Sequence, residues 1–267
     1  YLVTSQSHQG LVSLDIYFED HAGNAGTRTN STNDNSSVEI DTIDPLISNV
    51  AIGSTNDNSS WAKFGDNVTL SFDTSEVIQF PTDTVTIDGL TNVVVRRNAS
   101  WTGWTATGQV ASDASGMANY SISVKDNAGN VATPVTSTTS INLDTDKPSL
   151  QNVVVFTSNA NSSYARTGDN LTLRFNSSEL IETPVVTLAG DNLSLQDTSS
   201  GAGASWRAVY TVQDGDNGTV AFSIQYQDPA GNTDDNVTTT VSGNQITMDT
   251  SKPTVVPSSV TISSSNS

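Results

Sequence analysis

Apolar residues alternate with polar ones in three stretches of this chain, at residues 12–24, 118–130 and 220–232. In the first stretch the alternating apolar positions are Val12, Leu14, Ile16 and Phe18. A period of two is typical of a β-strand with one face on a core and the other in water. Each stretch ends in Asp-x-Ala-Gly-Asn, where Gly allows a positive φ and Asp and Asn bond the local backbone. The pattern predicts three half-buried strands, each followed by the same turn.

Other landmarks return in the same order about 103–105 residues later, which indicates a tandem repeat. Residues 59–78 realign on residues 162–181, and Trp104 returns as Trp206. The junction Asp-Thr-x-x-Pro, which ends at Pro45, returns at Pro148 and Pro253. We therefore expect four pieces: the C-terminal part of a domain (1–44), two complete domains (45–147 and 148–252) and the start of a further domain (253–267).

Each complete repeat is expected to hold about six or seven short strands separated by polar turns. The first strand covers residues 46–52 or 150–156, and the second is centred on Leu70 or Leu173. No helical period accompanies them, which favours a β-sandwich of two sheets. The short, Pro-containing junctions favour semi-rigid coupling. The predicted fold class is all-β, with tandem sandwich domains joined by these junctions.

These motifs resemble the bacterial Ig-like (Big-type) repeats that occur in tandem in large prokaryotic cell-surface proteins. The resemblance is carried by Gly-Asp-Asn-Val/Leu-Thr-Leu at 65–70 and 168–173, the Ser-Glu that follows, the Trp, Asp-x-Ala-Gly-Asn and Asp-Thr-x-x-Pro. It covers essentially the whole chain and implies tandem Ig-like domains. The acidic, Asn- and Thr-rich character looks most like archaeal surface-layer (S-layer) or other marine exoproteins. Such repeats serve adhesins, stalks and S-layers alike, so the resemblance implies no single function.

The charge balance limits the kinds of partner that the chain can bind. Its 28 acidic and 10 basic residues give a net charge of -18. Nucleic acid would be repelled, whereas cations would be gathered. No apolar run reaches membrane-spanning length, so we expect no membrane insertion within this segment. The chain opens and ends inside repeats, and we expect an extracellular or cell-surface location with the secretion signal and anchor outside the segment.

The sequence offers little support for an enzyme. Its two histidines are His8 and His21, and His21 occupies the variable turn position that Asn127 and Pro229 fill in the other copies. The chain has no Cys nucleophile, and no Ser-His-Asp set or phosphate-binding Gly loop is recognisable. We therefore expect no catalytic residues.

Acidic residues far apart in sequence are expected to meet where each junction enters its domain, because an Ig-like path brings several loops to that end. The candidate ligands are Asp41, Asp44, Glu76 and Asp126 for one domain, and Asp144, Asp146, Glu179 and Asp228 for the next. Clustered carboxylates suit Ca²⁺, which takes about 6–8 oxygens. The alternative is that each Asp caps its own turn and faces water.

The acceptor sequence for N-glycans, Asn-x-Ser/Thr, occurs many times. The candidate sites are Asn30, Asn35, Asn58, Asn67, Asn98, Asn119, Asn161, Asn170, Asn176, Asn192, Asn217 and Asn236. Several recur at matched places in the two repeats, as Asn58 does with Asn161. Such recurrence is equally explained by inheritance with the repeat.

The tryptophans divide into two classes. Trp104 and Trp206 begin alternating strands, and we expect them in the cores. Trp61 and Trp101 have no Trp counterpart in the next repeat and are the better candidates for an exposed contact.

Together these features favour a structural, non-enzymatic and self-assembling S-layer-like segment. Its partners would be other copies of itself or neighbouring surface proteins, with N-glycans and junction Ca²⁺ as possible additions. One alternative is a stalk that holds a distant adhesin tip away from the cell. The second alternative is an accessory or carbohydrate-binding module of a secreted enzyme.

Overall fold

The computed structural model describes residues 2–81, 84–200, 203–240 and 245–265. By its contacts the chain divides into two compact units, residues 1–145 and 146–267. Each unit contains one β-sandwich, and each is described by itself below.

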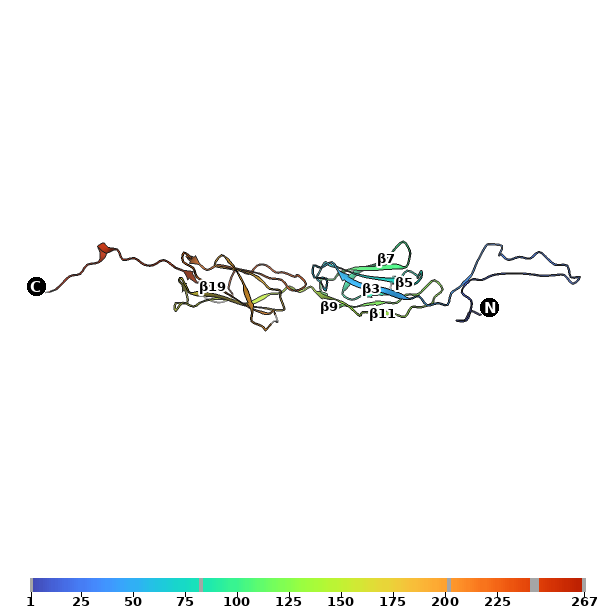
Figure 1. The fold of residues 1–267 in the computed structure, drawn as a ribbon, viewed down its shortest axis with the longest axis horizontal. Helices are drawn as coiled ribbons and strands as arrows, with labels where there is room; N and C mark the ends of the chain where they lie inside the picture. Colours follow the sequence, from blue (N-terminus) through green and yellow to red (C-terminus); the bar gives the residue numbers. More distant parts are fainter. Residues whose placement is uncertain (1, 82–83, 201–202, 241–244, 266–267) are drawn as a thin grey trace. The chain divides into compact units, whose positions relative to one another are not determined.

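The first unit holds two facing layers, with β3, β5 and β7 in one and β9 and β11 in the other (Figure 1). The first sheet has the order β3 (Ile47–Ser54), β5 (Asn67–Thr74), β8 (Gly103–Val110), β7 (Leu90–Arg97). The second layer begins with β11 (Val135–Thr136), β10 (Tyr120–Ile122), β6 (Val85–Ile87). It continues as β4 (Trp61–Ala62), β12 (Ile141–Asp144), β9 (Ser115–Ala118), where β4 and β12 run parallel.

This strand order is that of an Ig-like domain. Counted along the chain, the first sheet contains the first (β3), second (β5), fifth (β8) and fourth (β7) strands of an Ig-like domain. The second layer contains the third (β6), sixth (β9 and β10) and seventh (β11 and β12). The sixth strand is interrupted between β9 and β10, and the seventh between β11 and β12. The all-β, tandem Ig-like prediction is therefore confirmed.

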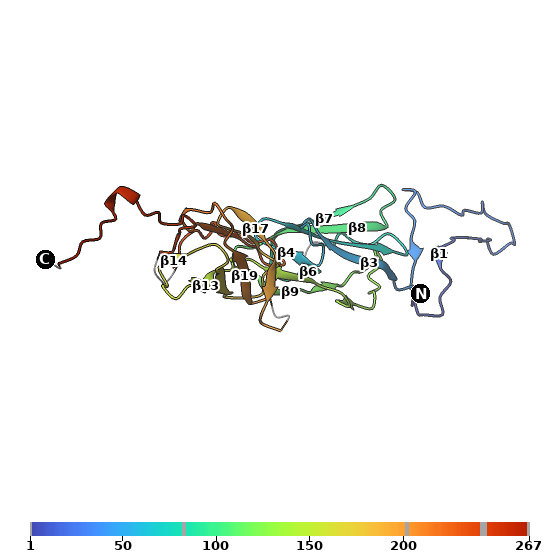
Figure 2. The same cartoon turned by 60° about the vertical axis from the view of Figure 1, so that its left-hand side comes forward.

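The second unit repeats the arrangement, and Figure 2 labels β13, β14, β17 and β19 within it. Its four-stranded sheet has the order β13 (Leu150–Thr157), β15 (Asn170–Ser177), β19 (Ser205–Thr211), β18 (Leu195–Asp197). The opposite layer contains β17 (Asp191–Leu193), β16 (Val185–Leu188), β21 (Phe222–Gln225) and, beyond them, β14 (Tyr164–Ala165), β22 (Thr247–Met248), β20 (Gly218–Thr219).

Alternating apolar residues build each core, as the period of two predicts. On β5 the buried positions are Val68, Leu70 and Phe72, and the ring of Trp104 stacks on Phe72 at 6.4 Å between centroids. Trp206 is buried in the second unit in the same way, so the assignment of both tryptophans to the cores is confirmed. Burying each large side chain stabilises the fold by roughly 1.5–3 kcal/mol.

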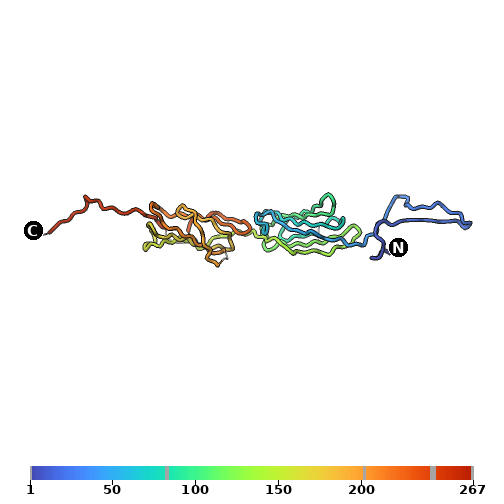
Figure 3. The backbone as a smooth tube through the Cα atoms, in the orientation of Figure 1, coloured from blue at the N-terminus to red at the C-terminus, as the bar shows by residue number. Residues whose placement is uncertain are grey.

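The first of the three alternating stretches departs from its prediction. Val12, Leu14, Ile16 and Phe18 are all at least 36% exposed. Only isolated bridges such as Ile16 to Thr29 form there, beside the short strands β1 (Gly10–Leu11) and β2 (Glu39–Ile40). The expected half-buried strand is wrong for this copy, because no second sheet in the described part of the chain covers its apolar face. Figure 3 traces this segment as an open blue loop.

The C-terminal segment contains one 3₁₀ turn, η1 (Pro257–Ser259), and its Val255 and Val260 are exposed. Among the described residues, no helix has the length and apolar character needed to cross a membrane.

A buried tyrosine gives a test of the second sandwich. Tyr210 Oη donates to Asp216 Oδ2 at 2.7 Å, and this bond, together with burial, raises the pKa of Tyr210 to about 12. We expect Tyr210→Phe to lower the free energy of unfolding by about 1.5–3 kcal/mol at pH 7, because a hydrogen bond to a carboxylate is lost. The raised pKa makes this contribution complete below the ordinary pKa of about 10 and lost as pH approaches 12.

Urea unfolding of both proteins between pH 7 and 11.5 measures this effect. The difference between wild type and Tyr210→Phe should shrink above pH 10. A difference that stays constant across this range would show that the phenol proton is not what stabilises the loop.

Candidate metal centre

The Asp-x-Ala-Gly-Asn turn positions a buried carboxylate at the end of the core strand β10. Asp126 Oδ1 accepts hydrogen bonds from the backbone N–H of Gly129 at 2.6 Å and of Asn130 at 2.9 Å. Its Oδ2 accepts from Asn130 Nδ2 at 2.6 Å. The turn closes because Gly129 adopts a φ of 101°, which is unfavourable for residues with a side chain. The Asp126 side chain, which is only 1% exposed, is therefore held in one orientation.

The loop that follows β5 supplies a second carboxylate. Thr74 Oγ1 donates to the backbone carbonyl of Glu76 at 2.7 Å, which turns the chain as the strand ends. Ile78 then forms a bridge with Asp126, so the loop returns beside the turn. Glu76 is half-buried in this position.

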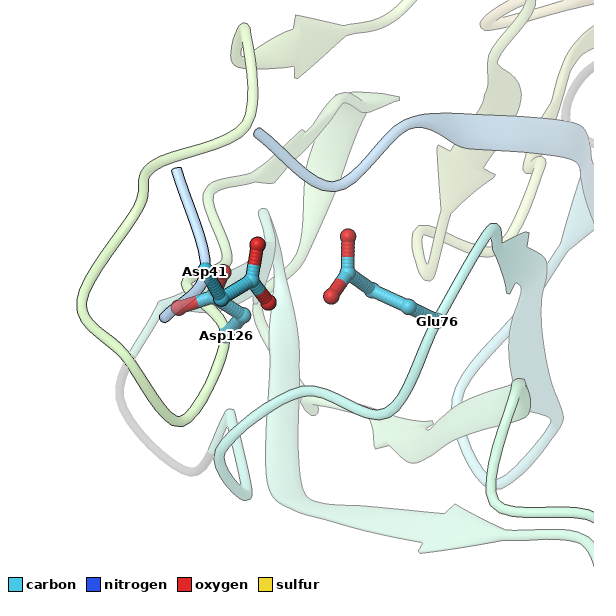
Figure 4. Close-up of side chains that lie close together, drawn as sticks. All are labelled: Asp41, Glu76 and Asp126. Atoms are coloured by element: carbon cyan, nitrogen blue, oxygen red, sulfur yellow. The ribbon is translucent and has the colours of Figure 1, made fainter. Parts of the chain in front are cut away.

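The segment that precedes β3 supplies the third carboxylate, from Asp41. Asn130 Nδ2 also donates to the backbone carbonyl of Asp41 at 3.2 Å, which ties this segment to the turn. One carboxylate oxygen from each of Asp41, Glu76 and Asp126 lies within 4.8 Å of the other two. Figure 4 shows Glu76 reaching toward the other two side chains from its own loop. We call these three residues the acidic triad.

The charges in the acidic triad oppose one another. Burial, followed by the negative charges of Asp41 and Asp126, raises the pKa of Glu76. Burial also acts to raise the pKa of Asp126, but the hydrogen bonds from Asn130, Gly129 and Ala128 outweigh it and hold that pKa below its ordinary value. The triad therefore keeps a charged Asp126 beside a Glu76 whose charge is disfavoured. A bound cation would relieve this repulsion.

The donor set fits a hard cation such as Ca²⁺ better than metals that prefer His or Cys ligands. Carboxylate oxygens are hard ligands, and the triad includes no His, while the chain contains no Cys. The carboxylate oxygens that lie close together are the ligands that the triad offers. With fewer oxygens than Ca²⁺ usually takes, the remaining positions would be filled by water.

The second unit repeats two of these local arrangements. Asp228, which is fully buried, accepts from the backbone N–H of Asn232 at 2.8 Å and from Asn232 Nδ2 at 2.7 Å. Ser177 Oγ donates to the carbonyl of Glu179, as Thr74 does to Glu76. Asp144, the sequence counterpart of Asp41, ends β12 in the first unit.

Two predicted ligands lie elsewhere. Asp44 and Asp146 are exposed, and neither belongs to a group of three acids or histidines found in the described part of the chain. Of the three Asp-x-Ala-Gly-Asn turns, the alternative in which the turn Asp faces water fits that of Asp20. That residue makes the same bonds to Asn24 on an exposed turn. Asp126 and Asp228 cap their turns but are buried.

The sequence motif did not reveal the role of Asn130. Its amide bonds both Asp126 and the incoming Asp41 segment, so it links the turn to the junction. The signal for such a residue is the Asn that ends all three copies of the turn, at Asn24, Asn130 and Asn232.

The candidate glycosylation sites all lie in the described part of the chain. The side chain of Asn176 is half-buried, and those of the other eleven are exposed. The amide nitrogen of Asn217 donates to the carbonyl of Gly215 at 3.0 Å, so a glycan there would have to share or break this bond. Glycan occupancy stays a prediction at every site. Of the two candidate surface tryptophans, Trp101 is 46% exposed and Trp61 is half-buried.

The chain matches no protein-family model and no curated protein in sequence. Solved structures of tandem domains are similar to it. Rst D1-D2 is 13% identical, with 74% of this chain and 100% of that chain covered and a TM-score of 0.36. The D00-D0 domain of intimin is 10% identical over 70% and 98%, with a TM-score of 0.30. The titin Ig tandem domains A164-A165 are 12% identical over 76% and 98%, with a TM-score of 0.23. Because these scores are low, the Ig-like assignment rests on the strand order described above.

Glu76 gives a test of the repulsion in the triad. Its raised pKa means that the folded state favours the protonated form, so the associated stability is present below the ordinary pKa of 4.5 and lost as pH rises through the folded value. We expect Glu76→Gln to raise the Tm of the first unit at pH 7 in chelator, by about 4–8 °C for each kcal/mol of repulsion relieved.

Calorimetry in EDTA at pH 7 and pH 4 measures this shift, which should disappear at pH 4. The matched control is Asp44→Asn, which removes an exposed junction acid outside the triad and should leave Tm unchanged. A Glu76→Gln protein that melts at or below the wild-type temperature at pH 7 would contradict the repulsion.

Proposed function

We propose that this chain is a structural, non-enzymatic segment of a large extracellular or cell-surface protein, in which Ig-like domains assemble into an S-layer-like coat. The tandem Ig-like domains would act as rigid spacers. Other copies of the chain or neighbouring surface proteins would be the partners, and N-glycans would decorate exposed sites.

The observation that carries this proposal is the acidic triad. It joins Asp41, which lies ahead of the first sandwich, to Glu76 and Asp126 within the sandwich. A Ca²⁺ ion bound there would fix the incoming segment to the end of the domain. The Asp41 carbonyl already accepts a hydrogen bond from Asn130, so the ion would reinforce an existing contact between the incoming segment and the turn. Stiff junctions are what a spacer or a lattice needs.

The net charge supports the same role. A charge of -18 keeps copies apart at low ionic strength and draws cations to the surface. Copies that carry this charge can pack closely only when cations neutralise part of it or when rare basic residues face acidic ones. Assembly should therefore depend on divalent cations.

Electron microscopy of the purified chain, first with Ca²⁺ and then with EDTA, tests the proposed function. We expect ordered sheets or tubes in Ca²⁺ that dissolve in chelator. Ca²⁺ should also raise the Tm of the wild-type chain and of the control Asp44→Asn by more than that of Glu76→Gln, because only the last variant replaces a triad carboxylate with a neutral amide.

Isolated rods that stay straight in EDTA would contradict the coat and favour the adhesin stalk. Equal calcium shifts in wild type and Glu76→Gln would show that the triad does not bind the ion, whatever the particles look like.

A further inference from the structure

The hairpin between β7 and β8 ends in a closed loop that presents an exposed tryptophan. The backbone N–H of Asn98 donates to the carbonyl of Gly103 at 2.8 Å, and that of Gly103 donates to Asn98 Oδ1 at 3.1 Å. The N–H of Trp101 donates to the Asn98 carbonyl at 3.2 Å. The loop is therefore pre-organised by its own hydrogen bonds.

Trp101 occupies an unfavourable backbone conformation. Its φ is 66°, in the left-handed region, which is unfavourable for a residue with a side chain. The Arg97 guanidinium carbon lies 3.1 Å from the centroid of its ring, so a cation covers one face of the indole. The side chain nevertheless stays 46% exposed. Strain of this kind often accompanies function.

The fold itself does not require these residues. Strand pairing aligns Arg97, opposite Trp104, with Asp197, opposite Trp206. The loop that follows is longer in the second unit, so the pairing gives Trp101 no counterpart, and residues 198–205 contain no tryptophan. The second unit thus completes the corresponding hairpin with an acidic residue in place of Arg97 and without a tryptophan in the loop. By the same register Arg96 aligns with Gln196. We call Arg96, Arg97 and Trp101 the basic tip.

The basic tip calls for an acidic partner. Neither Arg96 nor Arg97 forms an ion pair in the described part of the chain. Two of the 10 basic residues are therefore adjacent and without a counter-ion in a chain whose net charge is -18. Arg and Trp are also the residues that most often dominate binding energy at protein interfaces.

A matching surface exists on the second unit. A hollow of about 440 Å³ is lined by residues that include Glu182, Tyr226 and Asp234, which we call the acidic hollow. The negative charge of the hollow also acts on Tyr226: burial, followed by the charges of Asp234 and Asp235, raises the pKa of that phenol. The hollow has room for an indole ring with an adjacent guanidinium group.

The first unit lacks this acidic hollow. Gln79 takes the place of Glu182, since Gln79 N–H donates to the carbonyl of Lys125 as Glu182 N–H donates to that of Gln227. Counting from the shared Asp-x-Ala-Gly-Asn turn, Val124 and Ala132 take the places of Tyr226 and Asp234. Each of the two complementary surfaces is therefore present on only one of the two repeats.

We propose that the basic tip of one copy inserts into the acidic hollow of a second copy. Trp101 would enter the hollow, while Arg96 and Arg97 would pair with Glu182 and Asp234. Because the two surfaces differ, the contact is heterologous and can propagate from copy to copy into an open chain. This inference rests on the proposed function, since it names a contact through which the assembly would grow.

Two variants test the contact. Their substitutions are the sister repeat's own residues, which are compatible with the same fold, except Trp101→Gly, where glycine tolerates the positive φ. The first variant, Arg96→Gln with Arg97→Asp and Trp101→Gly, lacks the basic tip. The second variant, Glu182→Gln with Asp234→Ala, lacks the acidic hollow. Both are full-length chains made without glycosylation, because the candidate sites Asn98 and Asn236 lie in the tip loop and at the hollow, and the contact requires both to carry no glycan.

Sedimentation over a range of protein concentrations, in Ca²⁺, measures the association. Wild type should form long oligomers, and each variant alone should associate at least about thirty-fold more weakly. An equimolar mixture of the variants should stop at a one-to-one complex, because each retains only one half of the contact. Circular dichroism confirms that both variants are folded.

The contact would be overturned if the variants oligomerise as fully as wild type. It would also be overturned if wild type assembles but the mixture forms no complex. Either result would leave the proposed function standing. A wild-type chain that stays monomeric at every concentration, with and without Ca²⁺, would overturn both proposals.

Discussion

The structure depends on a carboxylate that is buried where a core strand ends. Asp126 is almost fully buried, and three hydrogen bonds from its own turn offset the cost of removing its charge from water. Asp228 repeats this solution in the second unit. Removing one hydrogen-bond donor to such a charge would cost roughly 1.5–3 kcal/mol. The turn after this strand is therefore rigid, and a segment that forms hydrogen bonds to the turn is held in place as well.

Asn130 connects this rigid turn to the segment that precedes the sandwich. Its side-chain amide bonds both the Asp126 carboxylate and the carbonyl of Asp41. Glu76 completes a group of three acids whose mutual repulsion is relieved by a cation or by protonation. A turn that stabilises the domain thus also prepares an ion site at its entrance.

Comparison of the two repeats separates what maintains the fold from what distinguishes the surface. The core tryptophans and the capped turns occur in both units, because each sandwich needs them. The Arg97–Trp101 stack occurs in one unit and the Glu182–Asp234 hollow in the other. Residues that differ at equivalent places of one fold are free to serve contacts, and here their charges are complementary.

The sequence by itself determined the strands of the two complete repeats and the core positions of Trp104 and Trp206, because alternation and duplication are local patterns. With an assumed Ig-like path it also placed Asp41, Glu76 and Asp126 at the same end. Tertiary structure decided that Asp44 stays outside this group and that Val12 to Phe18 remain exposed, since burial requires an opposing sheet. It alone brought Arg97 over Trp101, because that contact depends on the hairpin's register and on a positive φ.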